Sequence, residues 1–277
     1  MKWLSGSWNL IKANGARPRM PLQQVRIAES IAAELRVRIL SAGEGAVLPK
    51  QDELVAEFQV SYPSVREALR ILETEGLITV RRGNLGGSQI RRPDASSAAY
   101  ALGLALQATK VQLSDLSEAV VRLEPQCAVM CVESDDKGKV LPKLRQNVEE
   151  TRALLDDEPQ FLMKAREFHD LLVTSAGNKT TELMVRSLVA LWSSQEEAVE
   201  EAMAARGEAH TRENREAVIN AHAKIVARME AGDASGAERA VRRHNEAIRD
   251  LYISRVDGNE IVDAACARAR RSFQSLV

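Results

Sequence analysis

Hydrophobic positions recur at helical spacing along most of this chain, and the spacing changes only over residues 77–92. In the first helical stretch the apolar residues stand three or four positions apart: Ala28, Ile31, Ala32, Leu35 and Ile39. This spacing predicts one amphipathic helix, which the stretch Ser41–Gly45 ends. A short second helix is predicted over Asp52–Phe58.

A third helix is predicted to begin at Ser61, because serine is a good N-cap and Pro63 is tolerated in a first turn. Its apolar residues again follow the helical spacing: Val65, Ala68, Leu69 and Leu72. Gly76 suits the C′ position just after the helix.

Leu77–Val80 is a short stretch with β-branched residues, and Arg81–Gly87, which follows it, is rich in glycine. Ser88–Arg92 is a second short stretch that can pair with the first. This pattern predicts a β-hairpin with a glycine-rich tip. A helix, a helix–turn–helix and a hairpin in this order are the plan of a winged helix. We therefore expect residues 22–92 to form a winged helix-turn-helix of three helices plus a β-hairpin wing.

The remainder of the chain predicts an all-α bundle of six or seven helices, which makes the fold class mainly α. Helical periodicity covers about 97–108, 114–133, 138–156, 159–176, 179–205, 214–230 and 235–255. Asp157 or Glu158 before Pro159, and Ser235 with Glu238 as a capping box, are expected helix starts, and Gly177 and Gly232 are expected ends. The expected domains are a flexible arm (1–21), the winged helix (22–92), a linker and connecting helix (93–112), the helical domain (113–255) and a tail (256–277).

The 277 residues allow two domains, and their low aromatic content of 4% favours helices built from Ala, Leu and Val. No apolar stretch reaches the ~20 residues of a membrane span, and the first twenty residues lack the apolar run of a signal peptide. We therefore expect a cytoplasmic protein without a membrane partner. Cys127, Cys131 and Cys266 fit no disulfide or zinc spacing and are expected to be reduced thiols, the first two buried.

Residues 1–94 hold 14 Lys and Arg against 10 Asp and Glu, a charge of +4, while the whole chain carries −1. The N-terminal part is thus basic and the remainder acidic, which suggests that the first domain binds a polyanion. The second helix of a helix–turn–helix turns its N-terminal residues toward base edges in the major groove. The candidate DNA-binding residues are Ser61, Tyr62, Ser64, Arg66 and Arg70 on this helix, with Arg81, Arg82, Gly83 and Asn84 on the wing. The alternative is an ordinary charged helix with an exposed hairpin.

The stretch LPKQDELVAEFQVSYPSVREALRILETEGLITVRRGNLGG (Leu48–Gly87) resembles the N-terminal signature of the GntR family of bacterial transcription regulators. The body of the chain resembles the FadR-type branch of this family, which carries an all-helical FCD effector domain. The resemblance covers roughly residues 22–255. It implies a ligand-responsive regulator and not an enzyme, expected to be a repressor, that binds a double-stranded DNA operator as a homodimer.

Two positions depart from this family in the DNA-binding half. Members usually carry an arginine where this chain has Asp52, and another where it has Tyr62, and both commonly contact DNA. Arg66 and Gly83 match the family pattern, and Arg82 stands where the wing often has a basic residue. The loss of two cations should weaken phosphate contacts and flatten the salt dependence of binding.

His222 lies eleven residues before Asp233 and His244 lies eleven residues after it. If Asp233 is at the turn of a helical hairpin, both histidines stand at the same height on neighbouring helices. Two imidazoles at one level can share a metal ion. The alternative is that each histidine is an ordinary core or surface residue.

The family resemblance implies a divalent metal bound by three histidines and one aspartate, and His169, His222 and His244 match the three histidines. The usual aspartate position is Ala165, so only three neutral nitrogens are expected to hold Zn²⁺ or Ni²⁺, with open coordination positions. His210 matches nothing in the pattern and is expected to be a loop residue.

A small organic acid is the effector that the family implies. Many members bind it through an arginine at the position of Val120, and the candidate here is the nearby Arg122. Asn178, at the end of the family-like stretch FHDLL…AGN, is the second candidate effector-binding residue. The pocket can therefore be altered or accept a larger, less polar acid. Alternatives are a metal-free or ligand-independent regulator, or one that senses an acyl-CoA-like ligand. A metal-dependent hydrolase is a distant alternative, because no carboxylate is placed as an evident general base.

Overall fold

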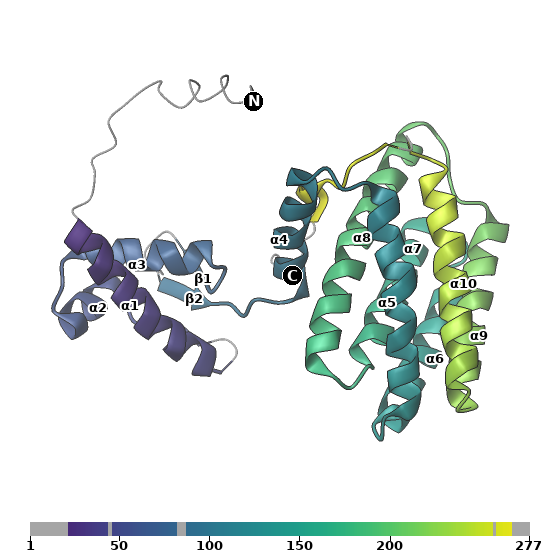
Figure 1. Cartoon of the computed structure of the whole chain (residues 1–277), viewed down its shortest axis with the longest axis horizontal. Helices are drawn as coiled ribbons and strands as arrows, with labels where there is room; N and C mark the ends of the chain where they lie inside the picture. The colour runs from purple at the N-terminus through teal and green to yellow at the C-terminus, as the bar shows by residue number, and fades with distance from the viewer. Residues whose placement is uncertain (1–21, 44–45, 82–86, 257–258, 268–277) are drawn as a thin grey trace, which may run out of the picture. The chain divides into compact units, whose positions relative to one another are not determined.

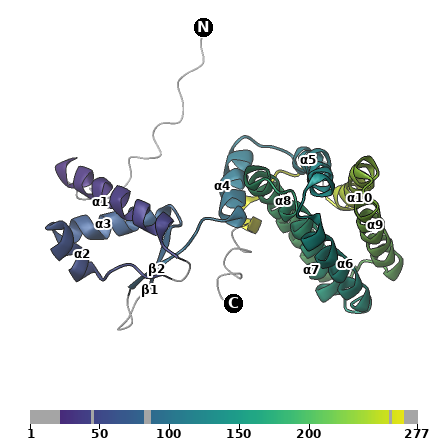
Figure 2. The same ribbon diagram turned by 90° about the horizontal axis from the view of Figure 1, so that it is seen from below.

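The computed structural model describes residues 22–43, 46–81, 87–256 and 259–267 of the chain. By internal contacts the chain divides into two compact units, Met1–Pro93 and Asp94–Val277. The described part contains ten helices and one two-stranded sheet (Figures 1 and 2). None of the described helices has the length and apolar character needed to cross a membrane.

The first unit contains three helices followed by a hairpin, which confirms the predicted plan. Its elements are α1 (Leu22–Ser41), α2 (Gln51–Phe58), α3 (Tyr62–Thr74), β1 (Ile78–Arg81) and β2 (Gly87–Ile90). The strands are antiparallel, with Ile78 opposite Ile90. The core is built from the predicted apolar faces: Ile31, Ala32, Leu35 and Ile39 of α1, Leu54 of α2, and Val65, Ala68, Leu69 and Leu72 of α3.

Both ends of α3 follow from local chemistry, although one predicted contact is absent. Ser61 occupies the N-cap position with extended backbone, but its side chain makes no capping bond to the helix. Its hydroxyl instead lies 3.0 Å from the hydroxyl of Ser64. At the other end Gly76 has a φ of +76°, the left-handed conformation that glycine adopts readily. The predicted N-cap at Ser61 and the predicted end at Gly76 are therefore both confirmed, although the serine side chain makes no bond to the helix.

The second unit is a helical bundle with seven described helices, within the predicted number of six or seven. They are α4 (Ala95–Ala108), α5 (Leu113–Glu133), α6 (Lys137–Ala153), α7 (Glu158–Thr174), α8 (Lys179–Ala205), α9 (Arg212–Glu230) and α10 (Ala234–Ile253). Helix α10 packs along both α5 and α9, and α7 lies against α6 and α8 (Figure 2). This arrangement brings α5, α7, α9 and α10 around one interior region.

Polar residues set the helix ends of this unit. Asp157 is the N-cap of α7 and accepts a hydrogen bond from the Gln160 amide. Of the two predicted starts, Asp157 and Glu158, the first is therefore confirmed. The predicted capping box of Ser235 and Glu238 is wrong, because α10 begins two residues earlier. Its N-cap is Asp233, whose carboxylate accepts a 2.8 Å hydrogen bond from the Gly236 amide.

A segment beyond the last helix returns to the beginning of the bundle. Leu113 donates its amide to the Glu260 carbonyl at 2.9 Å, and Val262 donates to the Val111 carbonyl at 3.0 Å. Within α4, a Cβ on Gly103 would lie 3.3 Å from the Cα of Ala264, so the helix and this segment approach closely at glycine. The described part of the predicted tail is therefore packed into the second unit.

Candidate functional site

The first candidate surface is the N-terminal end of α3. Tyr62, its first residue, is 45% exposed, and Arg66 is exposed one turn later. Ser64 differs from the other predicted contacts, since it is only 2% exposed. Its hydroxyl faces Ser61 within the unit, so Ser64 contributes to packing and is not available on this surface.

Most other described arginines of this surface and its surroundings are held by glutamates. Arg70 pairs with Glu67 at 2.5 Å within α3, and Arg36 pairs with Glu75 at 2.5 Å. These side chains are partly exposed, so each pair contributes little to stability. Arg66 has no such ion pair within the described residues, which leaves its guanidinium available for a partner.

The two departures from the family arginines contact each other. The Tyr62 phenol lies near the Asp52 carboxylate of α2, and the interaction with that carboxylate raises the pKa of Tyr62. The phenol therefore stays protonated near neutral pH. We expected the two missing arginines to be independent changes. The structure instead places Asp52 of α2 and Tyr62 of α3 next to each other.

The wing is described only in part. Arg81 ends β1 opposite Gly87. The other candidates, Arg82, Gly83 and Asn84, lie outside the described residues.

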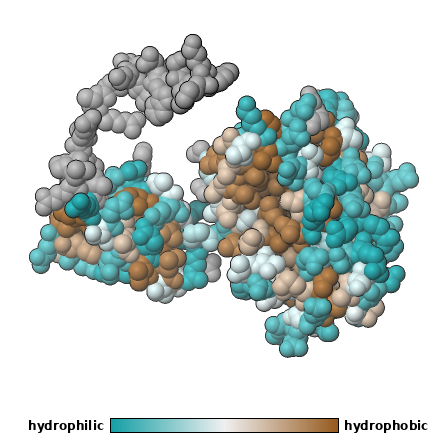
Figure 3. All heavy atoms as spheres, in the orientation of Figure 1, coloured by the Kyte–Doolittle hydropathy of each residue, from teal (hydrophilic) through white to brown (hydrophobic). Residues whose placement is uncertain are grey.

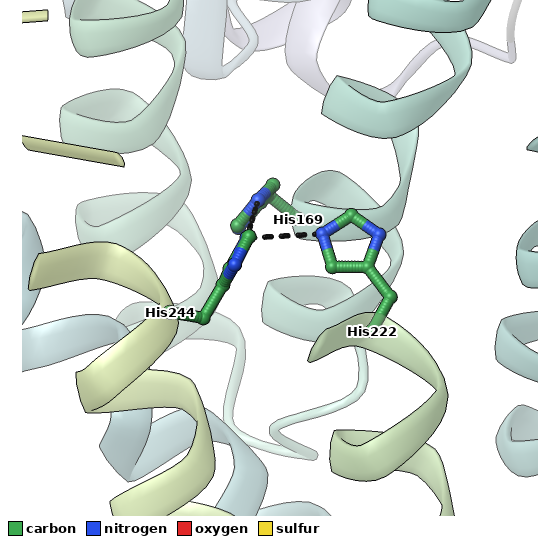
Figure 4. Close-up of side chains that lie close together, drawn as sticks. All are labelled: His169, His222 and His244. Carbon is green, nitrogen blue, oxygen red and sulfur yellow. Dashed lines mark hydrogen bonds between the residues drawn. The ribbon is translucent and has the colours of Figure 1, made fainter. Parts of the chain in front are cut away.

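The second candidate site is formed by three histidines from three helices. His169 lies on α7, His222 on α9 and His244 on α10, and their rings point toward one another (Figure 4). The Nε2 atoms of His222 and His244 are 3.0 Å apart, and those of His244 and His169 are 3.3 Å apart. One ligand atom from each lies within 4.8 Å of the others. The matched heights expected around Asp233 are thus present in the structure.

The donor set fits a divalent metal. Zinc bound to nitrogen at about 2.0–2.1 Å in a tetrahedral site places its ligands roughly 3.3 Å apart, close to the separations found here. The Nε2 atom of His244 lies within hydrogen-bond distance of both other Nε2 atoms, yet it can donate only one hydrogen. His222 Nδ1 is buried without a hydrogen-bond partner. The three nitrogens are therefore better satisfied by a shared cation than by one another.

Burial keeps two of the rings neutral. Desolvation, aided by the neighbouring histidines, lowers the pKa of His222 well below its usual value and that of His244 to about 3. Burial also acts against the charge of His169, but the Glu124 carboxylate outweighs it and raises the pKa of that ring. Neutral imidazoles are the form that binds metal ions.

A cavity of about 60 Å³ opens beside the histidines. Its polar lining includes Arg166 of α7, Glu196 and Glu200 of α8, Tyr252 of α10 and the loop residue His210. Arg166 is largely buried and faces three carboxylates, because it pairs with Glu200 and lies 3.9 Å from Glu196 and 3.5 Å from Glu197. Carboxylates therefore outnumber guanidinium groups in this cluster, and burial raises the pKa of Glu196 to about 7.

The predicted effector residues lie elsewhere. Arg122 is exposed, pairs with Glu118 at 2.7 Å and lines an open groove together with residues of α5 and α10. Asn178 is the N-cap of α8, where its side chain accepts the Thr181 amide at 2.9 Å. Neither belongs to the cavity lining, whereas Ala165 lines it one turn before His169.

Sequence reasoning missed the charged residues around the histidines. They are Glu124, Arg166, Glu196 and Glu200, together with Tyr252 and the buried His210. Glu124 left a signal, since it is a lone carboxylate on the otherwise apolar face of α5 that also carries Val120, Val121 and Cys127. The others lie on helices with many charged residues, and their burial depends on how those helices pack.

Family models match both parts of the chain. The model described as "Bacterial regulatory proteins, gntR family" matches residues 27–84, and the FCD domain matches residues 115–247. Together they cover more than half of the chain.

Curated relatives and a solved structure agree with these matches. The HTH-type transcriptional repressor NanR of Klebsiella aerogenes is 30% identical over 164 residues, and that of Salmonella newport is 32% identical over 172 residues. Each match covers 58% of this chain and 62% of the relative, so the chain matches less than two thirds of their length. The structure of a Streptococcus agalactiae GntR superimposes with a TM-score of 0.62 at 24% identity, over 81% of this chain and 99% of that one, which shows a shared fold.

Proposed function

The chain belongs to the GntR family of bacterial regulatory proteins and carries an FCD domain, and from this premise we propose that it is a ligand-responsive, DNA-binding transcription regulator. The observation that carries the proposal is the convergence of three buried histidines on a cavity, in a chain whose other unit presents an exposed helix–turn–helix. The curated relatives are named as repressors, and we propose the same sign of regulation here.

DNA recognition is assigned to the exposed end of α3 and to the wing. Arg66 is the principal contact, because its guanidinium is exposed and makes no described ion pair. A guanidinium in the major groove can bind guanine through two hydrogen bonds or hold a phosphate. Arg81, Arg82, Gly83 and Asn84 are proposed to reach the DNA backbone or the minor groove.

The regulator is proposed to act as a homodimer, which matches the two-fold symmetry of a palindromic operator. Support comes from apolar side chains that gather on the face of the second unit formed by α4 and α8 (Figure 3). Exposed apolar residues on these helices include Leu104, Leu183 and Met184. Exposed apolar patches of this kind mark protein interaction sites.

His169, His222 and His244 are proposed to hold a divalent metal, Zn²⁺ or Ni²⁺. The bound ion would supply a positive charge and open coordination positions for an oxygen ligand beside the cavity. The chain's own residues define the rest of the pocket. Arg166 is already engaged by Glu196, Glu197 and Glu200. The second arginine of the lining, Arg215, donates to the carbonyls of Leu155 and His210.

The proposed effector is a small organic acid. The described cavity lining carries two arginines and two glutamates, so a bound divalent ion would make it positive and would attract an anionic effector. Effector binding then changes DNA affinity only to the extent that it favours one of two arrangements of the protein. Metal and effector are therefore expected to act together on operator affinity.

Selection of bound DNA from a random pool tests the proposal. The full chain is loaded with Zn²⁺, the selected operator is recovered, and binding is measured again with citrate, lactate and glucuronate at several concentrations. A palindromic consensus and reduced affinity with at least one acid, only in the metal-loaded protein, are expected. Failure to enrich any sequence contradicts the proposed DNA-binding role.

The alternative is a regulator that works without metal. It is favoured by one observation, the absence of a carboxylate at Ala165, which removes the fourth ligand of the family site. Metal analysis of the native protein separates the two. An operator affinity that responds to an effector in chelator-treated protein supports the alternative.

A further inference from the structure

Glu124 is a fully buried carboxylate that reaches the histidine centre from α5. Its side chain is 0% exposed, and its Oε1 atom lies 2.6 Å from Nδ1 of His169. Its Oε2 atom accepts a 2.8 Å hydrogen bond from the Nδ2 amide of Asn245. A buried charge is costly unless it is paired and hydrogen bonded, and both oxygens of Glu124 have a partner.

This contact selects one tautomer of His169. When Nδ1 donates its hydrogen to Glu124, the Nε2 atom keeps a free lone pair. That Nε2 atom is the one that lies 3.3 Å from Nε2 of His244. The carboxylate thus turns the ring so that its metal-binding nitrogen faces the other two histidines.

Asn245 makes the arrangement specific to this centre. It is the next residue after His244 on α10, so one helix supplies both a histidine of the centre and the second hydrogen bond to Glu124. Helices α5, α7 and α10 are therefore joined at the same level as the three Nε2 atoms. A carboxylate that served only to join two helices would have no need to meet a histidine of the centre.

We propose that Glu124 is the positioning residue of the three-histidine centre and supplies, through His169, the negative charge that position 165 does not. This inference rests on the proposed function, since it requires that the histidines bind a metal. Carboxylates behind metal-bound histidines raise the basicity of the ring, and their loss typically weakens metal binding about 10- to 100-fold.

The variant Glu124→Gln separates charge from shape. A glutamine is nearly the same size, and its amide oxygen can still accept the His169 hydrogen. What is removed is the charge and the second acceptor, so the Asn245 amide must turn to present its oxygen to the new NH2 group. Glu118→Gln is the matched control, because Glu118 lies on the same helix but forms partly exposed ion pairs with Arg122 and Arg249.

The test measures metal binding by the full chain in three forms: unaltered, Glu124→Gln and Glu118→Gln. Zn²⁺ affinity is determined by competition with a chromophoric chelator, and Co²⁺ is added to record the visible absorption bands of the bound ion. Thermal melting of the metal-free proteins reports folding. We expect Glu124→Gln to bind Zn²⁺ roughly 10- to 100-fold more weakly, with shifted Co²⁺ bands, while Glu118→Gln matches the unaltered chain.

Two outcomes would overturn the inference. The first contradicts only the role of Glu124, and the second contradicts the metal site as well. If Glu124→Gln melts at a lower temperature but binds Zn²⁺ with unchanged affinity and unchanged Co²⁺ bands, Glu124 is a packing residue, and the proposed metal site stands. If the unaltered chain binds neither Zn²⁺, Ni²⁺ nor Co²⁺, the metal site itself is wrong and the inference falls with it.

Discussion

The α2–α3 surface of the first unit and the histidine centre of the second have each lost charged residues that their family usually carries. On the surface, Asp52 and Tyr62 stand in place of two arginines and are near neighbours, exposed to solvent. In the interior, Ala165 stands in place of an aspartate, and the buried Glu124 remains behind His169.

The difference between these regions follows from their exposure. An exposed polar group can be satisfied by water, so its replacement changes what the surface recognises without a large effect on folding. A buried polar group must find a partner inside the protein, so the groups around it are constrained. We therefore expect the removal of a buried ligand to alter binding by a larger factor than the removal of a surface contact.

The largest effect is expected for His244→Ala, because the Nε2 atom of His244 lies between those of the other two histidines. Removal of one of three ligands should weaken Zn²⁺ binding by roughly 100-fold or more. The measurement is chelator competition with the purified full chain. His210→Ala is the matched control, since His210 lines the same cavity but lies outside the group of three. Equal losses in both variants would contradict the assignment.

The next effect is expected for Arg66→Ala. Loss of a base or phosphate contact from an unpaired arginine should weaken operator binding roughly 10- to 100-fold. The gel shift is measured at moderate salt on the operator recovered by selection. Arg70→Ala serves as the control, because Glu67 already engages that guanidinium, and a larger loss there than at Arg66 would reverse the assigned roles.

A smaller effect is expected when the surface pair is returned to arginines. The double variant Asp52→Arg with Tyr62→Arg should steepen the dependence of log affinity on log salt by roughly 0.9 for each phosphate gained, so by up to about 1.8. Binding to the selected operator is followed from low to high salt. A slope identical to that of the unaltered chain would show that these positions do not meet the DNA backbone.

The smallest effect is expected for Ala165→Asp in the interior. The new carboxylate would enter the cavity one turn before His169 and could reach the metal. Because Glu124 already offsets part of the charge, we expect Zn²⁺ affinity to rise only by roughly 10-fold. A gain of several hundredfold would mean that Glu124 contributes little, which would also weaken the inference drawn for it.

Helix positions were predictable because they depend on local spacing. The order of elements in both units, the left-handed glycines 76, 177 and 232 and the equal heights of His222 and His244 all followed from short-range patterns. The position of Asp233 as an N-cap was missed because aspartate competes with the nearby Ser235 for that role.

Side-chain surroundings were harder to predict because they depend on how distant helices pack. Glu124 meets His169 and Asn245, which are 45 and 121 residues away in the chain. Of the predicted effector residues, Arg122 lines an open groove and Asn178 caps α8, positions that sequence proximity and family resemblance do not specify. Ser64 was assigned to the DNA surface although its spacing also fits the buried face of α3.

The contact between Gly103 and Ala264 has a consequence for the architecture of the second unit. Its first helix and its last described segment touch, and the amide and carbonyl bonds at Leu113 and Val262 hold the segment against the start of α5. The first and last described parts of this unit are thus neighbours in space. Domains whose ends meet tolerate circular permutation and transfer between proteins. The second unit therefore has a geometry suited to transfer between proteins, and the chain connects it to the winged helix once, after Pro93.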